Sequence, residues 1–237
     1  MIYKRILLKL SGEVLSKNGE RGIQHEQLLY YTEEIKKIHA LGVKVAIVVG
    51  GGNIHRGGRN VLDLDRVESD KMGMLATVIN GIALHSYLNN HSVPSLHLSS
   101  FDFSKMLPTY SRCHAMETLE KGTVVILTGG LGLPYFTTDT AASLRGIELK
   151  MDVILKATQV DGIYAADPKL DPTAHKFDHL TFQAAMEKNL AILDKTAFVL
   201  CEAHSLPLIV FNITTPDALR RVVLGEQIGT VVGKNYC

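Results

Sequence analysis

Phosphate binding is the first chemistry that the residues suggest, because a lysine leads into a glycine turn at Lys9-Leu10-Ser11-Gly12-Glu13. Alone, this lysine reads equally well as a strand-end residue whose ammonium group reaches solvent. A second turn, Gly50-Gly51-Gly52-Asn53, favours the first interpretation, since consecutive glycines leave backbone N–H groups open to an anion. Arg56 follows closely, and its guanidinium can donate two hydrogen bonds to phosphate oxygens. The two turns together favour an anion site, although neither ends in the Gly-Lys-Ser or Gly-Lys-Thr of a P-loop.

Two later loops carry residues of the same kind. Gly129-Gly130-Leu131-Gly132 precedes Thr137-Thr138-Asp139, which reads either as a helix cap or as an anion site at a helix N-terminus. Residues 156–168 bring hydroxyl, aromatic and carboxylate groups together, and the ring of Tyr164 is suited to cover a purine. Asp167, directly before a proline, has the alternative role of starting a turn.

Alternating strands and helices must position these four loops. Short aliphatic runs are typical of buried parallel strands, and apolar residues at a 3.6-residue period indicate helices between them. We predict strands at 6–10, 43–49, 93–98, 123–128, 153–157, 208–211 and 230–232, and helices at 26–41, 69–88, 115–120, 138–149, 182–188, 195–204 and 218–224. The segment after Asp161 is predicted to be a loop rich in Asp and Pro.

This alternation predicts an α/β protein, in which the four loops meet at the carboxyl edge of the sheet. Open α/β sheets bind their ligands at that edge. A nucleotide together with a second phosphorylated or carboxylated ligand is the economical interpretation, and it indicates a kinase.

The composition is that of an ordinary soluble globular protein, with 46% hydrophobic residues, 21% charged residues and a formal net charge of +1. This balance predicts neither a nucleic-acid substrate nor a membrane partner, and we find no apolar run long enough for a bilayer. The start of the chain does not resemble a signal peptide. Three scattered cysteines fit a reducing compartment, so the cytoplasm is the expected location.

Taken together, the motifs resemble those of the amino acid kinase family, most specifically its members that act on UMP, over nearly the whole chain. The resemblance implies a three-layer α/β/α sandwich around one mostly parallel central sheet, with residues 1–237 forming a single domain. An acceptor lobe would span roughly 1–150 and an ATP lobe roughly 151–237. The most specific pieces are Lys9 to Gly12, Gly50 to Asn53 with Arg56-Gly57, Asp70 to Thr77, Phe136 to Asp139, Leu144 to Glu148, and Lys156 to Pro168.

The resemblance further implies transfer of the γ-phosphoryl group of ATP to UMP, giving UDP and ADP in pyrimidine nucleotide biosynthesis. Mg²⁺ would arrive with ATP, and the protein would form a homohexamer. UMP already carries an ionised phosphate, so no general base is needed, and positioning with charge stabilisation should suffice.

The same resemblance assigns roles to residues. Lys9, Arg56, Asp139 and Asp194 would be catalytic, with Asp194 orienting Lys9. The ATP site would contain Lys9, Leu10, Ser11, Gly12, Gly52, Arg56, Thr158, Tyr164 and Asp167. The UMP site would contain Gly51, Asp70, Leu131, Gly132, Leu133, Pro134, Tyr135, Phe136, Thr137 and Thr138.

Three departures from the family pattern affect specificity and regulation. Leu131 and Leu133 replace a hydroxyl and an amide beside the uracil, which leaves open whether the backbone makes those contacts. The loop at 17–22 differs from the sequence of relatives with a GTP effector site, so responses to GTP and UTP stay open. His55 is interpreted as a packing residue rather than an acid or base.

Two other functions remain as alternatives at this point. One is a carboxylate kinase of the same fold, against which Asp70 and the Thr137-Thr138 pair argue because they suit a ribose and a phosphate. The other is a nucleotide-binding regulator without turnover, although Lys9 and Arg56 are both present.

Overall fold

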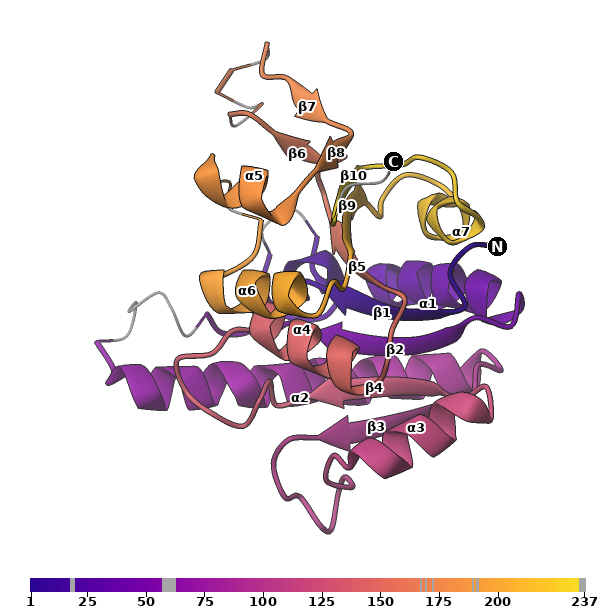
Figure 1. The fold of residues 1–237 in the computed structure, drawn as a ribbon. Coiled ribbons are helices and arrows are strands. Elements are labelled where there is room, and N and C mark those ends of the chain that lie inside the picture. The colour runs from indigo at the N-terminus through magenta and orange to yellow at the C-terminus, as the bar shows by residue number, and fades with distance from the viewer. Residues whose placement is uncertain are drawn as a thin grey trace.

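A central sheet of eight strands organises the molecule in the computed structural model, which describes residues 1–17, 20–56, 63–166, 168, 170–171, 173–188, 190 and 192–234. The strand order is β3-β4-β2-β1-β5-β9-β10-β8, and a separate pair, β6 and β7, projects from the sheet (Figure 1). Within the eight-stranded sheet all neighbours run parallel except β9 and β10, and the separate β6–β7 pair is antiparallel. The strands are β1 Arg5–Leu10, β2 Lys44–Val49, β3 Ser95–Ser99, β4 Val124–Thr128, β5 Val153–Thr158, β6 Ile163–Tyr164, β7 Lys176–Phe177, β8 His179–Leu180, β9 Leu208–Asn212 and β10 Thr230–Val232.

Helices cover both faces of this sheet, so the predicted three-layer α/β/α architecture is confirmed. Helices α1, α2 and α7 pack on one face, whereas α3, α4, α5 and α6 pack on the other, with α4 and α6 side by side (Figure 1). Their bounds are α1 His25–His39, α2 Arg66–Asn90, α3 Arg112–Glu120, α4 Thr138–Glu148, α5 Phe182–Glu187, α6 Lys195–Ala203 and α7 Ala218–Leu224, and a 3₁₀ helix, η1, spans Gly12–Leu15.

The alternation of side chains along β1 and β5 determines which residues can reach each layer. In β1, Leu8 and Leu10 pack toward α1, while Leu7 packs toward α4. In β5, Leu155 packs toward α1 and Ile154 toward α4. The lysines at positions 9 and 156 therefore project to the α4 side, since each lies two residues after a side chain on that side.

The predicted elements are present with ends shifted by a few residues, and two predictions need correction. The segment after Asp161 is not only loop, because it contains β8. This strand pairs in parallel with β10 and forms one edge of the sheet. Helix α2 begins at Arg66 rather than Ser69, because Asp65 caps it by accepting a hydrogen bond from the Val67 N–H. Among the described helices, none combines the length and apolarity needed to cross a membrane.

Candidate functional site

Two lysines and one aspartate form the centre of the site. Lys9 and Lys156 are register partners on the adjacent strands β1 and β5. Asp139, in the first turn of α4, forms an ion pair with each of them. Its Oδ1 lies 2.8 Å from the Lys9 Nζ, and its Oδ2 lies 2.9 Å from the Lys156 Nζ. Two ammonium groups side by side on neighbouring strands would repel each other, and the shared carboxylate offsets that repulsion.

All three side chains are largely buried. Burial by itself would raise the pKa of the Asp139 carboxyl, but the two ammonium groups outweigh it and hold that pKa below its usual value. Burial lowers the pKa of the Lys156 ammonium, while Asp139 opposes this shift and the charge of Lys9 adds to it. With Asp139 ionised, the cluster carries a net positive charge suited to an anionic ligand.

Asp194 does not orient Lys9 directly, so this sequence-based assignment is corrected. Its Oδ1 atom caps α6 by accepting from the Ala197 N–H at 2.9 Å. Its Oδ2 atom accepts from the hydroxyls of Thr137, at 2.5 Å, and Thr140, at 2.8 Å. Because the Thr137 Oγ1 in turn accepts from the Asp139 N–H, Asp194 stabilises the helix end that holds Asp139.

The glycines of the first two turns pack against each other and against α2. A Cβ atom on Gly12 would lie 2.6 Å from the Gly52 N, and one on Gly51 would lie 2.6 Å from the Gly73 carbonyl oxygen. A Cβ on Gly50 would similarly approach the Gly12 N at 2.8 Å. At Gly52, by contrast, no atom lies closer than 3.6 Å. Close packing thus explains why Gly12, Gly50 and Gly51 cannot carry a side chain, whereas Gly52 has open space around its Cα.

A cavity of about 230 Å³ lies between the triple-glycine loop, α2 and the N-terminus of α4. Gly52 and Arg56, assigned from sequence to ATP, line this cavity together with residues assigned to UMP. Arg56 forms an ion pair with Glu13, a carboxylate with which a phosphate would compete. The lining residues are Gly51, Gly52, His55, Arg56, Arg66, Asp70, Gly73, Met74, Thr77, Gly130, Phe136, Thr137 and Thr138.

Asp70 holds the glycine-rich loop that borders this first cavity. Its Oδ2 atom accepts from the Tyr135 N–H at 2.8 Å and from the Arg66 Nε at 2.8 Å. Tyr135 adopts a left-handed backbone with φ of 68°, and the Arg66 guanidinium lies 5.7 Å from the centre of its ring. Asp70 lies within α2 rather than at its first residue, and its carboxylate anchors the loop.

The rest of the predicted acceptor stretch is divided between the cavity and the surface. Phe136, Thr137 and Thr138 line the first cavity. Leu131 packs against the core on the α4 side, and Leu133 and Tyr135 are exposed. Gly132, Leu133 and Pro134 are not among the lining residues of the first cavity. His55 lies within hydrogen-bonding distance of Ser69, at 3.0 Å, in keeping with a packing role.

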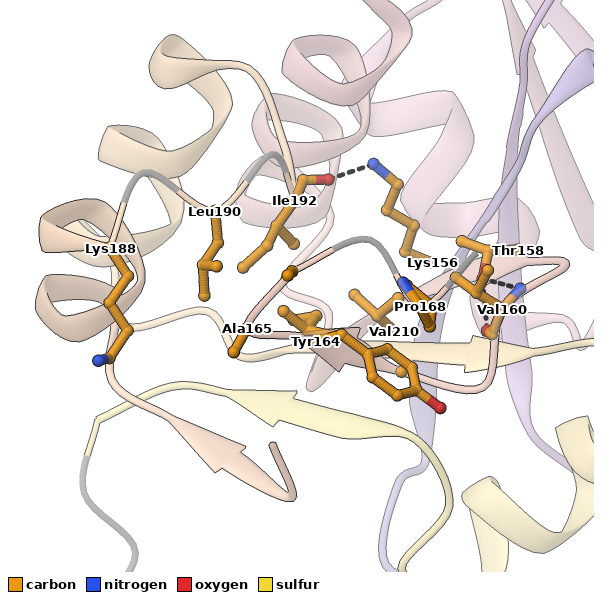
Figure 2. Close-up of a pocket in the computed structure, with 13 residues that line it drawn as sticks. Lys156, Thr158, Val160, Tyr164, Ala165, Pro168, Lys188, Leu190, Ile192 and Val210 are labelled. Atoms are coloured by element: carbon orange, nitrogen blue, oxygen red, sulfur yellow. Dashed lines mark hydrogen bonds between the residues drawn. The ribbon is translucent and has the colours of Figure 1, made fainter. Parts of the chain in front are cut away.

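A second, larger cavity of about 430 Å³ lies beside β5, β6 and β9, and Figure 2 shows its lining. Its volume falls in the range of small-molecule sites. Thr158 and Tyr164 line it as predicted, and the Tyr164 hydroxyl donates to Asp161 at 2.7 Å. The backbone carbonyl of Ile192 accepts from the Lys156 ammonium (Figure 2). Asp167 lies outside the described residues.

Lys156 links the second cavity to the edge of the first through its ion pair with Asp139, and the role assignments from sequence missed it. It lines the second cavity, while its partner Asp139 directly follows Thr138 of the first. The signal was available, because Lys156-Ala157-Thr158 repeats the lysine and hydroxyl spacing of Lys9-Leu10-Ser11. Leu10, which the sequence assigned to the ATP site, has a fully buried side chain, so only its backbone lies at the turn. No group of three His, Cys, Asp or Glu side chains among the described residues could hold a metal ion.

Relatives of the chain include curated proteins of nearly equal length. It is 49% identical to the uridylate kinase of Bacteroides thetaiotaomicron, over 97% of this chain and 98% of that protein. It is 48% identical to the uridylate kinase of Phocaeicola vulgatus, with the same coverage.

Solved structures give the same result. The UMP kinase of Bacillus anthracis superposes with a TM-score of 0.96 at 36% identity, covering 99% of this chain and 97% of that one. The UMP kinase of Ureaplasma parvum superposes with a TM-score of 0.92 at 39% identity, covering 99% and 100%. The model of the amino acid kinase family matches residues 4–212, and the predicted resemblance is confirmed. The chain belongs to the amino acid kinase family.

Proposed function

We propose that this protein is a UMP kinase, a transferase that moves the γ-phosphoryl group of ATP to UMP and forms UDP and ADP. The observation that carries the proposal is the cluster of Lys9, Asp139 and Lys156 beside two cavities, since Lys156 lines the second cavity and Asp139 directly follows Thr138 of the first. Two anionic ligands would approach this positive centre from opposite sides. The names of the relatives, uridylate kinase and UMP kinase, support UMP as the acceptor.

Charge stabilisation is the mechanism that these residues favour. The phosphate of UMP is already ionised near neutral pH, so it needs orientation and relief from repulsion rather than a base. The ammonium groups of Lys9 and Lys156 would stabilise the charge spreading over the transferred group. Asp139 would hold both lysines, and Arg56 would add a third cation from the glycine loop.

Mg²⁺ would enter bound to ATP and neutralise part of the phosphate charge. The described residues fit this account, because both oxygens of Asp139 are paired with lysines and both oxygens of Asp194 accept protein hydrogen bonds. Neither carboxylate belongs to a dedicated protein cage. The ligands of the ion would then be phosphate oxygens together with water molecules, several of which Mg²⁺ generally keeps when it binds.

The two cavities support the division of the chain into an acceptor lobe at 1–150 and an ATP lobe at 151–237. The first cavity is lined by residues between Gly51 and Thr138, and the second by residues between Lys156 and Val210. UMP would therefore occupy the first cavity, with its ribose near Asp70. ATP would occupy the second, with its phosphates directed toward Lys156 and Gly52.

We test the proposed function by measuring ADP release from ATP and Mg²⁺ with UMP, CMP, dUMP, aspartate, glutamate and acetylglutamate as acceptors. Turnover is expected with UMP at a rate far above the others. Preference for a carboxylate would instead establish a carboxylate kinase of the same fold. Nucleotide binding without turnover of any acceptor would favour a regulator, and either result overturns the proposal.

We further propose a homohexamer in the cytoplasm, with nucleotide effectors such as GTP or UTP. Self-association is supported by an apolar stripe on α2, formed by Met72, Leu75, Ile79 and Ile82, which are each exposed by 39–50%. The location is supported by Cys113 and Cys201, the two described cysteines, which are both free. The effector loop at 17–22 lies partly outside the described residues, since 18–19 are not among them.

A further inference from the structure

A polar cluster outside both cavities borders the far side of the acceptor loop. Arg145, near the end of α4, donates from Nη1 to Glu148 at 2.7 Å, and its guanidinium lies 3.7 Å from the centre of the Tyr110 ring. The Tyr110 hydroxyl donates to the same Glu148 carboxylate at 2.8 Å. Arg112 donates to the Glu148 carbonyl oxygen at 2.8 Å. The Arg145 side chain is only 11% exposed, so its contacts are held by packing, unlike those of an exposed surface ion pair.

Ser100 connects this cluster to the acceptor loop. The Arg145 Nη2 donates to the Ser100 Oγ at 3.4 Å, and the Ser100 hydroxyl donates to the Gly130 carbonyl oxygen at 2.7 Å. The Ser100 N–H also donates to the Thr128 carbonyl oxygen at 2.9 Å. Since Gly130 lines the first cavity, the chain of contacts runs from α4 through Ser100 to the proposed UMP site.

The orientation of one peptide group follows from these contacts. The C=O of Gly130 and the N–H of Leu131 belong to one planar trans peptide and point in opposite directions. Holding the carbonyl on Ser100 therefore turns the Leu131 N–H away from Ser100. That N–H has no acceptor among the residues that the structure describes.

Left-handed glycines make this orientation dependent on outside support. Gly129, Gly130 and Gly132 have φ values of 78°, 58° and 75°. Glycine populates such conformations without steric cost, but it also leaves them easily, so a loop built from it needs external anchors. On the α2 side, the Thr77 hydroxyl oxygen accepts from the Gly129 N–H at 2.8 Å. On the other side, Ser100 supplies the anchor at Gly130.

We propose that Arg145 is a positioning residue for the acceptor, which acts through Ser100 to hold the Gly130–Leu131 peptide so that its N–H can donate to the pyrimidine. This inference rests on the proposed function and deepens it. A backbone donor would recognise a carbonyl oxygen of uracil even though Leu131 and Leu133 carry no polar side chain. The relay contacts the acceptor side only, so it should affect UMP without affecting ATP.

The test measures kcat and the KM values for UMP and ATP in the full-length wild type, Arg145→Lys and Ser100→Ala. Arg145→Lys keeps the charge but loses the planar fork and its stacking on Tyr110. We expect the KM for UMP to rise about 10-fold in each variant, the size expected for loss of a charged or buried hydrogen bond, with the KM for ATP and kcat within about 2-fold. The double variant should be little worse than either single one, because both changes break one relay.

Arg221→Lys is the matched control, because Arg221 also pairs with a glutamate, Glu226, but lies on α7 away from both cavities. It should leave all three parameters unchanged. A wild type that turns over UMP, with both relay variants within 2-fold of its KM for UMP, would overturn this inference and leave the proposed function intact. Equal losses for UMP and ATP would also overturn it, since they would indicate a general structural defect. A wild type without UMP turnover would overturn the proposed function and this inference with it.

Discussion

Lys9 and Lys156 share one carboxylate, and this arrangement decides how their removal should be interpreted. Either lysine can be lost while Asp139 retains the other as an ion-pair partner. Removing Asp139 instead would leave two buried ammonium groups without a counter-charge, which is strongly destabilising. The lysines are therefore the residues whose loss tests chemistry separately from folding.

Lys9→Met is expected to lower kcat by at least about 10²-fold while the affinity for UMP stays within a few-fold, because it removes charge stabilisation at the transferred group. Lys156→Met should have an effect of similar size. The double variant should lose less than the product of the two, since both cations serve one centre. Steady-state kinetics and direct UMP titration measure these quantities. Lys44→Met is the control, because Lys44 begins the neighbouring strand β2 and pairs with Glu120 of α3, away from both cavities. Near-normal turnover of Lys9→Met would show that Lys9 does not stabilise the transferred group.

Gly51 and Gly52 should respond oppositely to alanine. In Gly51→Ala the new methyl group would lie 2.6 Å from the Gly73 carbonyl oxygen, so we expect a loss of about 1–3 kcal/mol in the free energy of unfolding. In Gly52→Ala it would have no neighbour within 3.6 Å, so stability should stay within about 0.5 kcal/mol. Activity of Gly52→Ala should nevertheless fall several-fold if its N–H meets a phosphate. Urea unfolding and ADP release measure the two effects, and a fully active Gly52→Ala would place the phosphates elsewhere.

Helix α2 acts at the scale of an element, because it supports the acceptor loop, closes the first cavity and packs on the sheet through Gly81. Asp70 and Thr77 each accept a hydrogen bond from a loop N–H. Deeper in the helix, a Cβ atom on Gly81 would lie 2.6 Å from the His97 Nε2. The position of the loop therefore depends on how closely α2 approaches the sheet.

Asp70→Ala should raise the KM for UMP about 10-fold or more, because it removes a loop anchor together with a proposed ribose contact. These two contributions can be separated. Loss of the anchor would weaken the binding of UMP and of dUMP equally. Loss of the ribose contact would weaken the binding of UMP alone and so reduce the preference for UMP over dUMP. Asp70→Asn is the comparison, since its amide oxygen can still accept from the Tyr135 N–H. An unchanged UMP/dUMP ratio in Asp70→Ala would limit Asp70 to anchoring the loop.

Acid should weaken the packing of α2 on the sheet through His97. This side chain is buried and lies 2.7 Å from the Thr128 hydroxyl, and its Nδ1 has no hydrogen-bond partner among the described residues. Burial, with a smaller contribution from His85, lowers the pKa of His97 to about 4, from an ordinary value of 6.5. Between these two pKa values, His97 is protonated in the unfolded chain and neutral in the folded one. The stabilisation is fully present above about pH 6.5 and is lost as the pH falls toward 4.

We expect the wild type to lose roughly 2 kcal/mol of unfolding free energy between pH 7 and pH 5 through this one group. His97→Gln cannot titrate, so its stability should change less over the same interval. His204→Gln, which alters an exposed histidine, is the matched control and should follow the wild type. Urea unfolding at the two pH values measures the difference. A His97→Gln curve parallel to that of the wild type would show that His97 does not carry the acid sensitivity.

At the scale of the whole molecule, the stripe on α2 predicts self-association. Met72, Leu75, Ile79 and Ile82 follow a three- and four-residue spacing, so they share one face of the helix. Ile79→Glu should shift the protein from a large species toward smaller ones in sedimentation velocity, because burying a carboxylate there is costly. Val199→Glu is the control, an exposed valine changed on α6, outside the stripe. A wild type that sediments as a monomer would exclude the homohexamer.

The sequence by itself determined the fold class, the order of the elements and the loops at the carboxyl edge of the sheet. These features depend on local periodicity and on glycine and proline positions, which are visible along the chain. The resemblance in its motifs also identified the family, which residues 4–212 confirm. Even Lys156 was visible in principle, since its lysine-to-hydroxyl spacing at a strand end repeats that of Lys9.

Only the tertiary structure decided which of these residues meet. The pairing of Lys9 with Lys156 depends on the register of β1 and β5, which are more than a hundred residues apart in the chain. Asp139 rather than Asp194 lies beside Lys9, because the first turn of α4 lies next to that lysine while the Asp194 carboxylate caps α6. The need for glycine at positions 50 and 51 also depends on packing, because their close contacts with Gly12 and Gly73 join segments that are distant in the chain. Local sequence determines which elements form, whereas contacts between residues distant in the chain depend on how those elements pack.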